Sequence, residues 1–383
     1  MKQNITAVIL CLALALSGCA QGQAPETEPA QSVEVQNSQS GRIDDTIKEN
    51  HQIHATLYNP DSIQCTVYQI ETIPTDLPGF AQILLPGDSS DYTLEHDEDY
   101  GDDSYITESG YTIRAGGVGV YLFHTDNPGK YDEIGRLNEL YAAEHPDETL
   151  QDLDFMTLRE AVGLGKKTIQ DLGINLELVT TCALGLHHER LDSYQQELLE
   201  RDKTMEIPDY DPFGKAYSME ALTTEDDCYY LKFNTAVDEI PVYGYPGEAA
   251  AATRDGVFSP LNVEMNMVIS RNGFEQVEIQ CPYRITDSVR TIKTLSPQEA
   301  LALYKNEWSQ TLLPAEDTYM EVQHIYLEYI PREVDGLLQL VPYWVFSYRE
   351  KFENTANGQT EWWPYQGADR FHAETGENYA FGG

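Results

Sequence analysis

Several stretches of the chain alternate apolar and polar residues, the period that a half-buried strand requires. His51–Asn59 and Ile63–Ile70 are rich in Val, Ile, Tyr and Thr, and the turn residues of segment 59–62 lie between them. This composition predicts a β-hairpin or meander. Tyr111–Phe123 alternates around three glycines, which predicts a strand or hairpin with close backbone approach.

Two helices are predicted by their start signals. Thr157 is followed three residues later by Glu160, and Ser296 is followed by Glu299 with a proline directly after the serine. Both pairs have the spacing of a capping box, in which the two side chains bind free amides of the first helical turn. Apolar residues recur at helical spacing after each box, and Gly173 marks the end of the first helix.

The clearest hairpin lies in the second half of the chain. Segments 263–269 and 277–281 alternate on either side of Asn272-Gly273, which predicts a type I′ turn. Two closing strands are predicted over Tyr319–Ile330 and Leu337–Tyr348. The second is apolar on both faces, as in a strand covered on both sides, whereas its Pro342 disfavours a fully paired central position.

Short motifs in the second half resemble a known family. They are the strand Cys228–Phe233, the tripeptide Ile240-Pro241-Val242 and the closing hexapeptide His372–Glu377, together with the hairpin and the capped helices. Residues 155–383 thereby resemble the PepSY-like modules of secreted and membrane-attached Firmicutes proteins, and the hexapeptide is similar to the ending of YycI-type regulatory domains. The resemblance implies inhibitory, sensory or partner-binding work and brings no catalytic residues. It departs from the family pattern at Glu239, where a small residue is usual, and this disfavours a tight turn.

These patterns together predict an α+β fold. We expect an N-terminal β-rich region followed by two PepSY-like units of antiparallel sheet packed with helices. The expected segments are a lipoprotein signal peptide over 1–18, a flexible tether over 19–45, the β-rich region over 46–154, and the PepSY-like units over 155–290 and 291–383.

The charge balance narrows the classes of partner. The 383 residues include 24 Lys and Arg against 64 Asp and Glu, a formal net charge of -40 at pH 7 with no basic cluster. Because phosphate binding needs a cationic surface, nucleic acid is excluded as a partner, and anionic lipid headgroups repel the chain unless a separate anchor holds it. A hydrophobic content of 41% fits a globular protein with a sizeable core.

The N-terminus supplies such an anchor. Lys2 precedes an apolar run that ends in Leu16-Ser17-Gly18-Cys19, and the run is shorter than the roughly 20 residues of a membrane-spanning helix. The tetrad resembles the lipobox of bacterial lipoproteins, in which the cysteine carries the lipid and becomes the mature N-terminus. Residues 20–41 are poor in large apolar side chains and predict a flexible tether. We expect an extracytoplasmic protein anchored to the cell membrane by lipidated Cys19; an ordinary secretory signal is the alternative.

The remaining cysteines predict neither a zinc site nor a defined disulfide. Beside Cys11 and Cys19, cysteines occur at positions 65, 182, 228 and 281. Four cysteines allow three disulfide pairings, and the sequence does not choose among them. None has a CxxC spacing, so a zinc or thioredoxin-type site is not predicted. Because Cys182 and Cys281 fall in strand-like apolar series, we expect free buried thiols.

Two further features resemble metal-binding motifs, but their residues do not fit the spacing that those motifs require. Asp91–Asp103 holds seven acids and no Lys or Arg, but an EF-hand loop with its glycine at Gly101 would begin at His96, where an acid is required. We therefore expect a solvated acidic turn. His187-His188-Glu189 lacks a second histidine one helical turn further on, and adjacent histidines do not share a helix face. We expect no metal and no cofactor.

Aromatic residues are the better lead to a ligand. Trp362, Trp363 and Tyr365 lie in a segment rich in Gly, Asn and Gln, and exposed aromatic pairs bind sugar faces or protein partners. The alternative is that these rings fold back onto the sheet. No GxSxG elbow or phosphate-binding loop is present, whereas a carboxylate pair for glycoside hydrolysis is a spatial feature that sequence spacing does not test.

The sequence therefore predicts a lipid-anchored cell-surface protein of binding or sensor type, without catalytic activity and with a protein partner. A carbohydrate or cell-wall ligand is the alternative, and a carboxylate-based hydrolase is a third hypothesis of lower weight.

Overall fold

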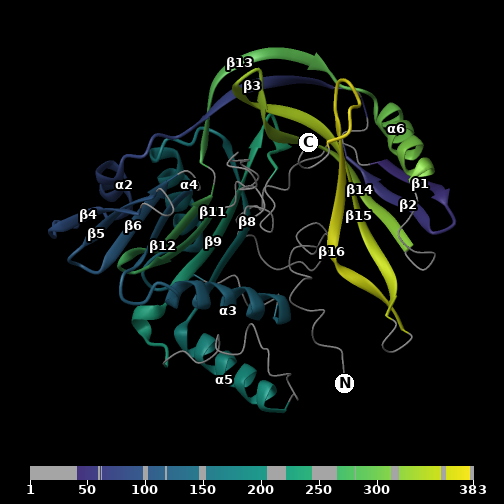
Figure 1. The fold of residues 1–383 in the computed structure, drawn as a ribbon. Helices are drawn as coiled ribbons and strands as arrows, with labels where there is room; N and C mark the ends of the chain where they lie inside the picture. Colours follow the sequence, from purple (N-terminus) through teal and green to yellow (C-terminus); the bar gives the residue numbers. More distant parts are fainter. Residues whose placement is uncertain are drawn as a thin grey trace, which may run out of the picture. The chain divides into compact units, whose positions relative to one another are not determined.

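The protein is mostly β structure. The computed structural model describes residues 41–58, 61, 63–97, 102–116, 119–145, 152–204, 221–243, 265–280, 282–311, 319–354 and 359–379. Strands hold 52% of these described residues and helices 26%, and the strands form two large sheets (Figure 1). The predicted α+β fold of helix-packed PepSY-like units is therefore wrong, because long strands that pair with one another replace the expected repeating units.

Among the described residues, the chain divides into two compact units. Unit 1 draws on the segments 72–235 and 265–284, and unit 2 on 41–71, 236–243 and 285–379. The segments predicted from the sequence are consecutive, so both units cut across them. Strand β1 (Gly41–Lys48) begins inside the predicted tether. The signal peptide, the rest of the tether and Cys19 lie outside the described residues.

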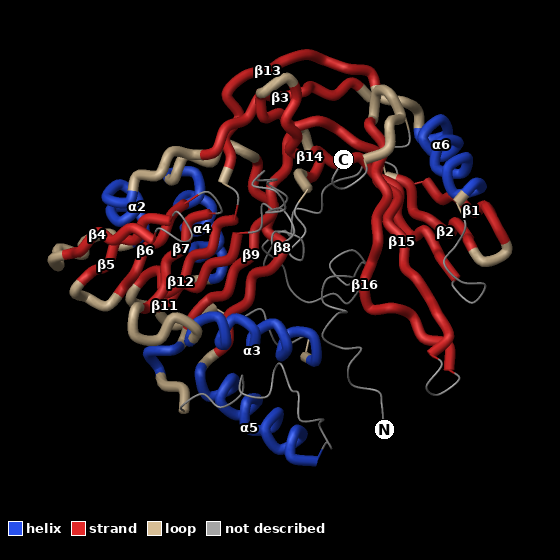
Figure 2. The backbone as a smooth tube through the Cα atoms, viewed as in Figure 1, coloured by secondary structure: helices blue, strands red, loops and turns tan. Residues whose placement is uncertain are grey.

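A nine-stranded sheet, as far as the chain is described, lies mainly in unit 1 (Figure 2). Hydrogen-bonded neighbours follow the order β10 (Ile240–Pro241), β9 (Cys228–Val237), β11 (Met265–Ser270), β12 (Gly273–Gln280), β7 (Gly119–His124), β6 (Tyr111–Gly116), β5 (Asp102–Thr107) and β4 (Tyr92–Asp97), and β8 (Glu177–Leu186) also pairs with β9. The predicted strand pair within Tyr111–Phe123 is confirmed as the hairpin of β6 and β7.

Helices cover both faces of this sheet. They are α2 (Leu77–Leu84), α3 (Lys130–Glu144), α4 (Leu158–Asp171) and α5 (His188–Thr204), with a short 3-10 helix η1 (Thr224–Asp226). A methyl group at Gly165 of α4 would come within 2.9 Å of the Phe233 ring, and one at Gly135 of α3 within 2.6 Å of the Tyr230 ring. Because successive strand residues point to opposite faces, α3 and α4 pack on opposite sides of β9, and α5 lies beside α3 (Figure 1).

Both predicted capping boxes are confirmed. The Glu160 carboxylate accepts the amide of Thr157 at 2.9 Å, and the Thr157 hydroxyl oxygen accepts the amide of Glu160. Ser296 and Glu299 make the same reciprocal bonds at the start of α6 (Pro297–Gln310). Gly173 has a φ of 101° just after α4, a left-handed conformation that favours glycine at a helix end.

A seven-stranded sheet, counted over the described residues, forms the centre of unit 2. Its order is β1, β2 (His51–Leu57), β14 (Tyr319–Val334), β15 (Leu337–Asn354), β3 (Gln64–Thr72) and β13 (Tyr283–Lys293), and β16 (Gln359–His372) also pairs with β15. Since β14 and β15 lie between β2 and β3, the predicted hairpin of segments 51–59 and 63–70 is wrong.

Pro342 occupies a permissive position on β15. The strand pairs with β3 up to Leu340 and with β16 from Tyr343 onward. The proline therefore lies where one partner strand gives way to the next, and the amide that it lacks breaks no ladder there.

An aromatic cluster holds α6 on the sheet of unit 2. Tyr304 stacks on Phe346 with 4.3 Å between ring centroids, and Trp308 meets the His51 ring edge-on at 5.0 Å. Nε2 of His51 lies 2.9 Å from the Tyr304 hydroxyl oxygen. Burial lowers the pKa of His51 to about 4, so the imidazole is neutral at pH 7 and belongs to the core.

The hairpin of β11 and β12 forms where it is predicted, but with another turn. Ser270 pairs with Gly273, so Arg271 and Asn272 are the central residues, and neither has a positive φ. Gly273 has a φ of 117° and opens β12. A type I′ turn requires a positive φ at both central residues, so the predicted type I′ turn is wrong, and the register shift of this hairpin lies between Val268 and Ile269.

A type I′ turn occurs instead at Asp238 and Glu239. Their φ values are 50° and 65°, and the flanking residues Val237 and Ile240 pair with each other. The Tyr68 hydroxyl donates to Asp238 at 2.7 Å. The expectation that Glu239 disfavours a tight turn is wrong, because the strand pairing and this hydrogen bond hold the turn.

Candidate functional site

Strand β4 forms an open edge of the unit 1 sheet. It ends the strand order, and within the described residues its one strand partner is β5 (Figure 2). Tyr92 keeps 50% of its surface exposed and Leu94 keeps 57%. Natural edge strands usually avoid large exposed apolar side chains, because an unpaired edge invites pairing with another chain. The edge is therefore the first candidate for a binding surface.

The exposed apolar residues of β4 share one face of the hairpin. Tyr92 stacks on Tyr105 of β5 with 4.1 Å between ring centroids and 19° between ring planes. Leu94 lies directly opposite Tyr105 in the strand register. The other face of β4 carries Thr93 and Glu95, both exposed. Each side of the edge thus offers a different chemistry: the side of Tyr92 and Leu94 is apolar up to His96, which lies opposite Asp103, and the other side is polar.

The backbone of β4 offers hydrogen-bonding groups at this edge. The amide of Glu108 donates to the carbonyl oxygen of Asp91 at 2.9 Å. Alternation along an antiparallel ladder then turns the amides and carbonyls of Tyr92, Leu94 and His96 away from β5. In the described part of the chain no strand lies beyond them.

Acidic residues surround the edge. The segment Asp91–Asp103, predicted as an acidic turn, consists mostly of the paired strands β4 and β5. Nδ1 of His96 lies 2.7 Å from Asp103 Oδ1, and Asp102 is buried. Among the described residues no three His, Cys, Asp or Glu side chains are grouped as a metal site requires. The acids leave a negative potential beside the open strand.

The aromatic residues predicted as ligand-binding lie on β16. Trp362, Trp363 and Tyr365 fall where the ladder with β15 is irregular, between Arg349 and Lys351. Three residues of β16 there face one residue of β15, which is a bulge of the kind found beside binding sites. The side chains of this stretch lie outside the described residues, so their ligand-binding role stays a prediction.

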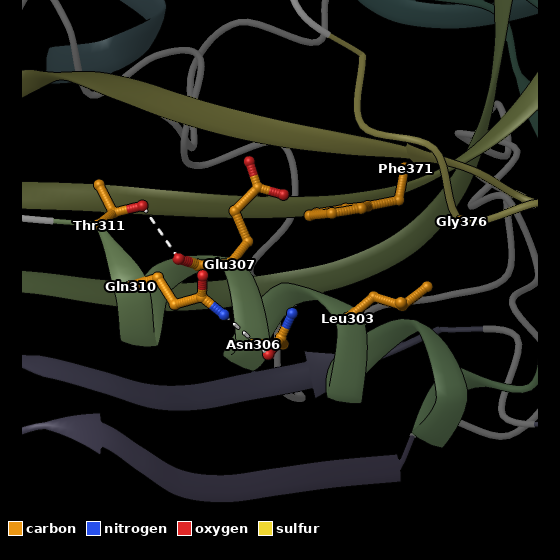
Figure 3. A pocket seen from close by; sticks show the side chains of 7 residues that line it. All are labelled: Leu303, Asn306, Glu307, Gln310, Thr311, Phe371 and Gly376. Carbon is orange, nitrogen blue, oxygen red and sulfur yellow. Dashed lines mark hydrogen bonds between the residues drawn. The ribbon is translucent and has the colours of Figure 1, made fainter.

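A polar depression of about 410 Å³ lies beside α6 (Figure 3). It is lined by Leu303, Asn306, Glu307, Gln310, Thr311, Phe371 and Gly376. Two of its side-chain amides bind each other, since Gln310 Nε2 donates a hydrogen bond to Asn306 Oδ1 at 3.3 Å. Phe371 is only 2% exposed and offers no free face to a sugar ring. Phe371 lies at the end of β16, and the bulge separates it from Trp362 along the strand, so the depression and the predicted aromatic site are formed by different parts of β16.

His187 and His188 share one carboxylate at the start of α5. Asp227 Oδ1 lies 2.8 Å from His188 Nδ1, and Asp227 Oδ2 lies 3.3 Å from His187 Nδ1. Asp227 also accepts the backbone amide of His188 at 2.6 Å. Both imidazoles reach Asp227 because His187 precedes the helix, so the expectation that adjacent histidines do not share a helix face does not apply to this pair. Burial works to raise the pKa of Asp227, but these hydrogen bonds outweigh it and lower the pKa. The Asp227 carboxylate therefore caps the N-terminus of α5.

Ser270, Glu275 and His124 meet in unit 1, but not in the order of a catalytic triad. Glu275 accepts the Ser270 hydroxyl and the Tyr111 hydroxyl, the latter at 3.0 Å, and lies 2.6 Å from His124 Nε2. In a serine hydrolase the imidazole stands between serine and acid, because it takes the serine's proton. Here the carboxylate stands between the other two, so His124 has no contact through which to activate Ser270.

The thiols that the structure describes in the core are unreactive. Cys65 and Cys228 are buried and free, as expected, whereas Cys182 is only half-buried, so the expectation of a buried thiol is wrong at that residue. Burial raises the pKa of Cys65 to about 12, so its thiolate is scarce at neutral pH. Cys281 lies outside the described residues.

Sequence reasoning missed the open strand β4. Its signal was present, because Tyr92-Thr93-Leu94-Glu95 alternates apolar and polar residues in the period of a strand. The density of acids in the same segment favoured a turn and hid this alternation.

Comparison with known proteins identifies a similar fold but indicates no activity. No protein-family model matches the chain, and no curated protein matches it. A crystal structure of an uncharacterized protein from Eubacterium rectale ATCC 33656 is similar, with 18% sequence identity and a TM-score of 0.53, over 89% of this chain and 93% of that chain. At this identity the likeness shows the fold alone. In the described part of the chain, no helix is long and apolar enough to cross a membrane.

Proposed function

We propose that the chain is a lipid-anchored extracytoplasmic protein that binds a protein partner at the cell surface. The observation that carries the binding is the open edge of β4, where exposed Tyr92 and Leu94 accompany backbone groups that face outward. Addition of a strand to such an edge is a common mode of protein recognition, in which the main chain supplies affinity and the side chains supply specificity.

The N-terminal tetrad Leu16-Ser17-Gly18-Cys19 supports the anchor. Removal of the signal takes Lys2 with it and deepens the formal charge from -40 to -41. A body of this charge is repelled by anionic headgroups, so the lipid must hold it at the membrane. Two acyl chains on one cysteine give stable attachment, at about 0.8 kcal/mol per buried methylene.

The anchor is tested by measuring in which cell fraction the protein is found. Cys19→Ala is expected to release the protein from the membrane fraction into the medium, because the acylated thiol is removed. Cys11→Ala is the matched control, since it changes a cysteine of the apolar signal run and leaves the lipobox intact. Immunoblotting of both fractions measures the outcome. Retention of the Cys19→Ala protein on the membrane would contradict the anchor.

The partner is tested by crosslinking in intact cells. A photo-reactive residue in place of Leu94 is expected to capture one recurring protein, which mass spectrometry identifies. The control position is Leu303, which is 36% exposed on helix α6 and belongs to no strand edge, and it is expected to capture none. Absence of a specific protein at Leu94 would overturn the binding proposal. Capture of glycans alone would favour the carbohydrate alternative.

A further inference from the structure

We infer that β4 receives an extended, cationic segment of the partner, which adds to the unit 1 sheet as one more strand. The inference rests on the proposed function and names the chemistry of its partner. It is carried by three features of the same edge: backbone groups that face outward, two faces of different polarity, and a surplus of acids.

The backbone of β4 fixes the conformation of the occupant. Tyr92, Leu94 and His96 turn their amides and carbonyls outward, as the bond from Glu108 to Asp91 requires. Side chains stand roughly perpendicular to a sheet, so they leave this edge open to another main chain. An extended segment has amides and carbonyls at the same spacing and can therefore form hydrogen bonds with each of these groups. A helix does not, because its own amides are already bonded.

The two faces of β4 fix the side-chain pattern of the occupant. A residue of the added strand beside Leu94 would meet the apolar face formed with Tyr92 and Tyr105. Its neighbours along the strand would point to the opposite face, where Glu95 is exposed. Cross-strand pairs of like polarity and opposite charge stabilise a sheet. The occupant that fits therefore alternates apolar residues with Lys or Arg.

Charge selects against a second copy of this chain. Segment 91–103 carries seven acids and no Lys or Arg, so two β4 edges brought together would set carboxylates against carboxylates. Like charges directly opposite each other across strands are destabilising. The net charge of -40 adds a longer-range repulsion between copies and an attraction for cationic partners. The edge is thereby protected from self-association and stays open to a basic segment.

Amide hydrogen exchange tests strand addition directly. The protein is the full chain with Cys19→Ala, and the probe is a seven-residue peptide in which lysine and valine alternate. Saturating peptide is expected to slow exchange at the amides of Leu94 and His96 by at least tenfold. The amides of Thr93 and Glu95 already face β5 and are expected to change little. The matched control peptide carries glutamate in place of lysine and is expected to protect none of them.

A pair of variants separates the backbone from the side chain. Leu94→Ala and Leu94→Pro both remove the leucine, but only the second removes the outward amide. Proline is tolerated where an edge strand's amide faces away from its neighbour, and retained exchange protection of Thr93 shows that the hairpin is intact. The loss of one hydrogen bond is expected to make lysine-peptide binding about tenfold weaker for Leu94→Pro than for Leu94→Ala.

Several results would overturn the inference. Equal protection by both peptides would remove charge selection, and no protection by either would remove strand addition. Slower exchange at Leu94 with rising protein concentration, without peptide, would assign the edge to a second copy. If these tests fail but Leu94 still crosslinks to one specific protein in cells, the proposed function holds and the partner is of another chemical kind. Absence of crosslinking would end the proposed function itself.

Discussion

At the scale of single residues, the turn between β9 and β10 holds strain that one substitution can relieve. Asp238 and Glu239 have φ values of 50° and 65°, where a Cβ atom crowds the following carbonyl. Glycine has no Cβ, so Glu239→Gly is expected to raise the free energy of unfolding by about 0.5–1 kcal/mol, the relief being partly offset by greater freedom in the unfolded chain. Urea denaturation followed by circular dichroism measures the change.

The control for this turn is Glu239→Ala. Alanine removes the carboxylate and keeps the Cβ, so it is expected to leave the strain in place. A gain of the same size from both variants would assign the effect to charge and contradict the explanation from strain. Asp238 is left unchanged in both proteins, because it accepts the Tyr68 hydroxyl at 2.7 Å.

This turn also shows where local sequence reasoning fails. Glu239 stands where the resembled modules usually have a small residue, and this departure alone disfavours a tight turn. The structure overrides it through contacts that are distant in sequence, including the amide of Tyr243, which donates to the carbonyl of Tyr329 at 2.7 Å. Backbone strain of a few kcal/mol persists only where such surrounding contacts fix the conformation.

At the scale of elements, helix α6 is bound to β16 through a half-buried acid. Trp308 Nε1 donates to Asp369 Oδ2 at 2.7 Å, and burial raises the pKa of Asp369 to about 6. Because the pKa of this carboxyl is higher in the folded than in the unfolded state, the folded protein becomes less stable as pH rises from about 4 through 6. Asp369→Asn keeps an acceptor for Trp308 and removes the charge. It is expected to raise the free energy of unfolding by roughly 1–3 kcal/mol at pH 8 and by little at pH 4.

The comparison with wild type at each pH isolates Asp369 from His51, whose ring contacts the same Trp308. The pKa of His51 is lowered from 6.5 to about 4, so His51 contributes stability that is lost as pH falls through this range, the opposite direction. Both proteins carry His51, and its contribution cancels in their difference. Thermal unfolding at the two pH values provides the measurement. An equal gain at both would show that Asp369 acts through its shape or packing and not through its charge.

The elements divide into those that the sequence could specify and those that it could not. The boxes of Thr157 with Glu160 and Ser296 with Glu299 were predictable, because both partners lie within one helical turn. The partner of β2 was not, because β14 pairs with it in parallel from more than 260 positions further along the chain. Turn residues at 59–62 predicted a hairpin that two other strands interrupt. Pairing between distant strands depends on the assembled core, which no local pattern contains.

At the scale of the whole molecule, the candidate site depends on strand order. Tyr92 and Leu94 are ordinary strand residues in the sequence, and they form an open edge only because the order of the sheet ends at β4. The acids of segment 91–103 are visible in the sequence and predict a solvated turn, whereas most of the segment forms paired strands. Their role as neighbours of an unpaired strand required the fold. The predicted residues Trp362, Trp363 and Tyr365 lie instead on a strand of the other unit.

The net charge gives the whole molecule a stability that depends on salt. With 64 acids against 24 bases, repulsion within the folded chain exceeds attraction, and dissolved ions screen exposed charges over about 8 Å at physiological ionic strength. Raising NaCl from about 0.02 M to about 0.5 M at pH 7 is therefore expected to raise the melting temperature by a few degrees. Near pH 4, where carboxyls are about half protonated, the same addition should have a smaller effect. Calorimetry in both buffers measures it, and a melting temperature that falls with salt at pH 7 would show that favourable ion pairs outweigh the repulsion.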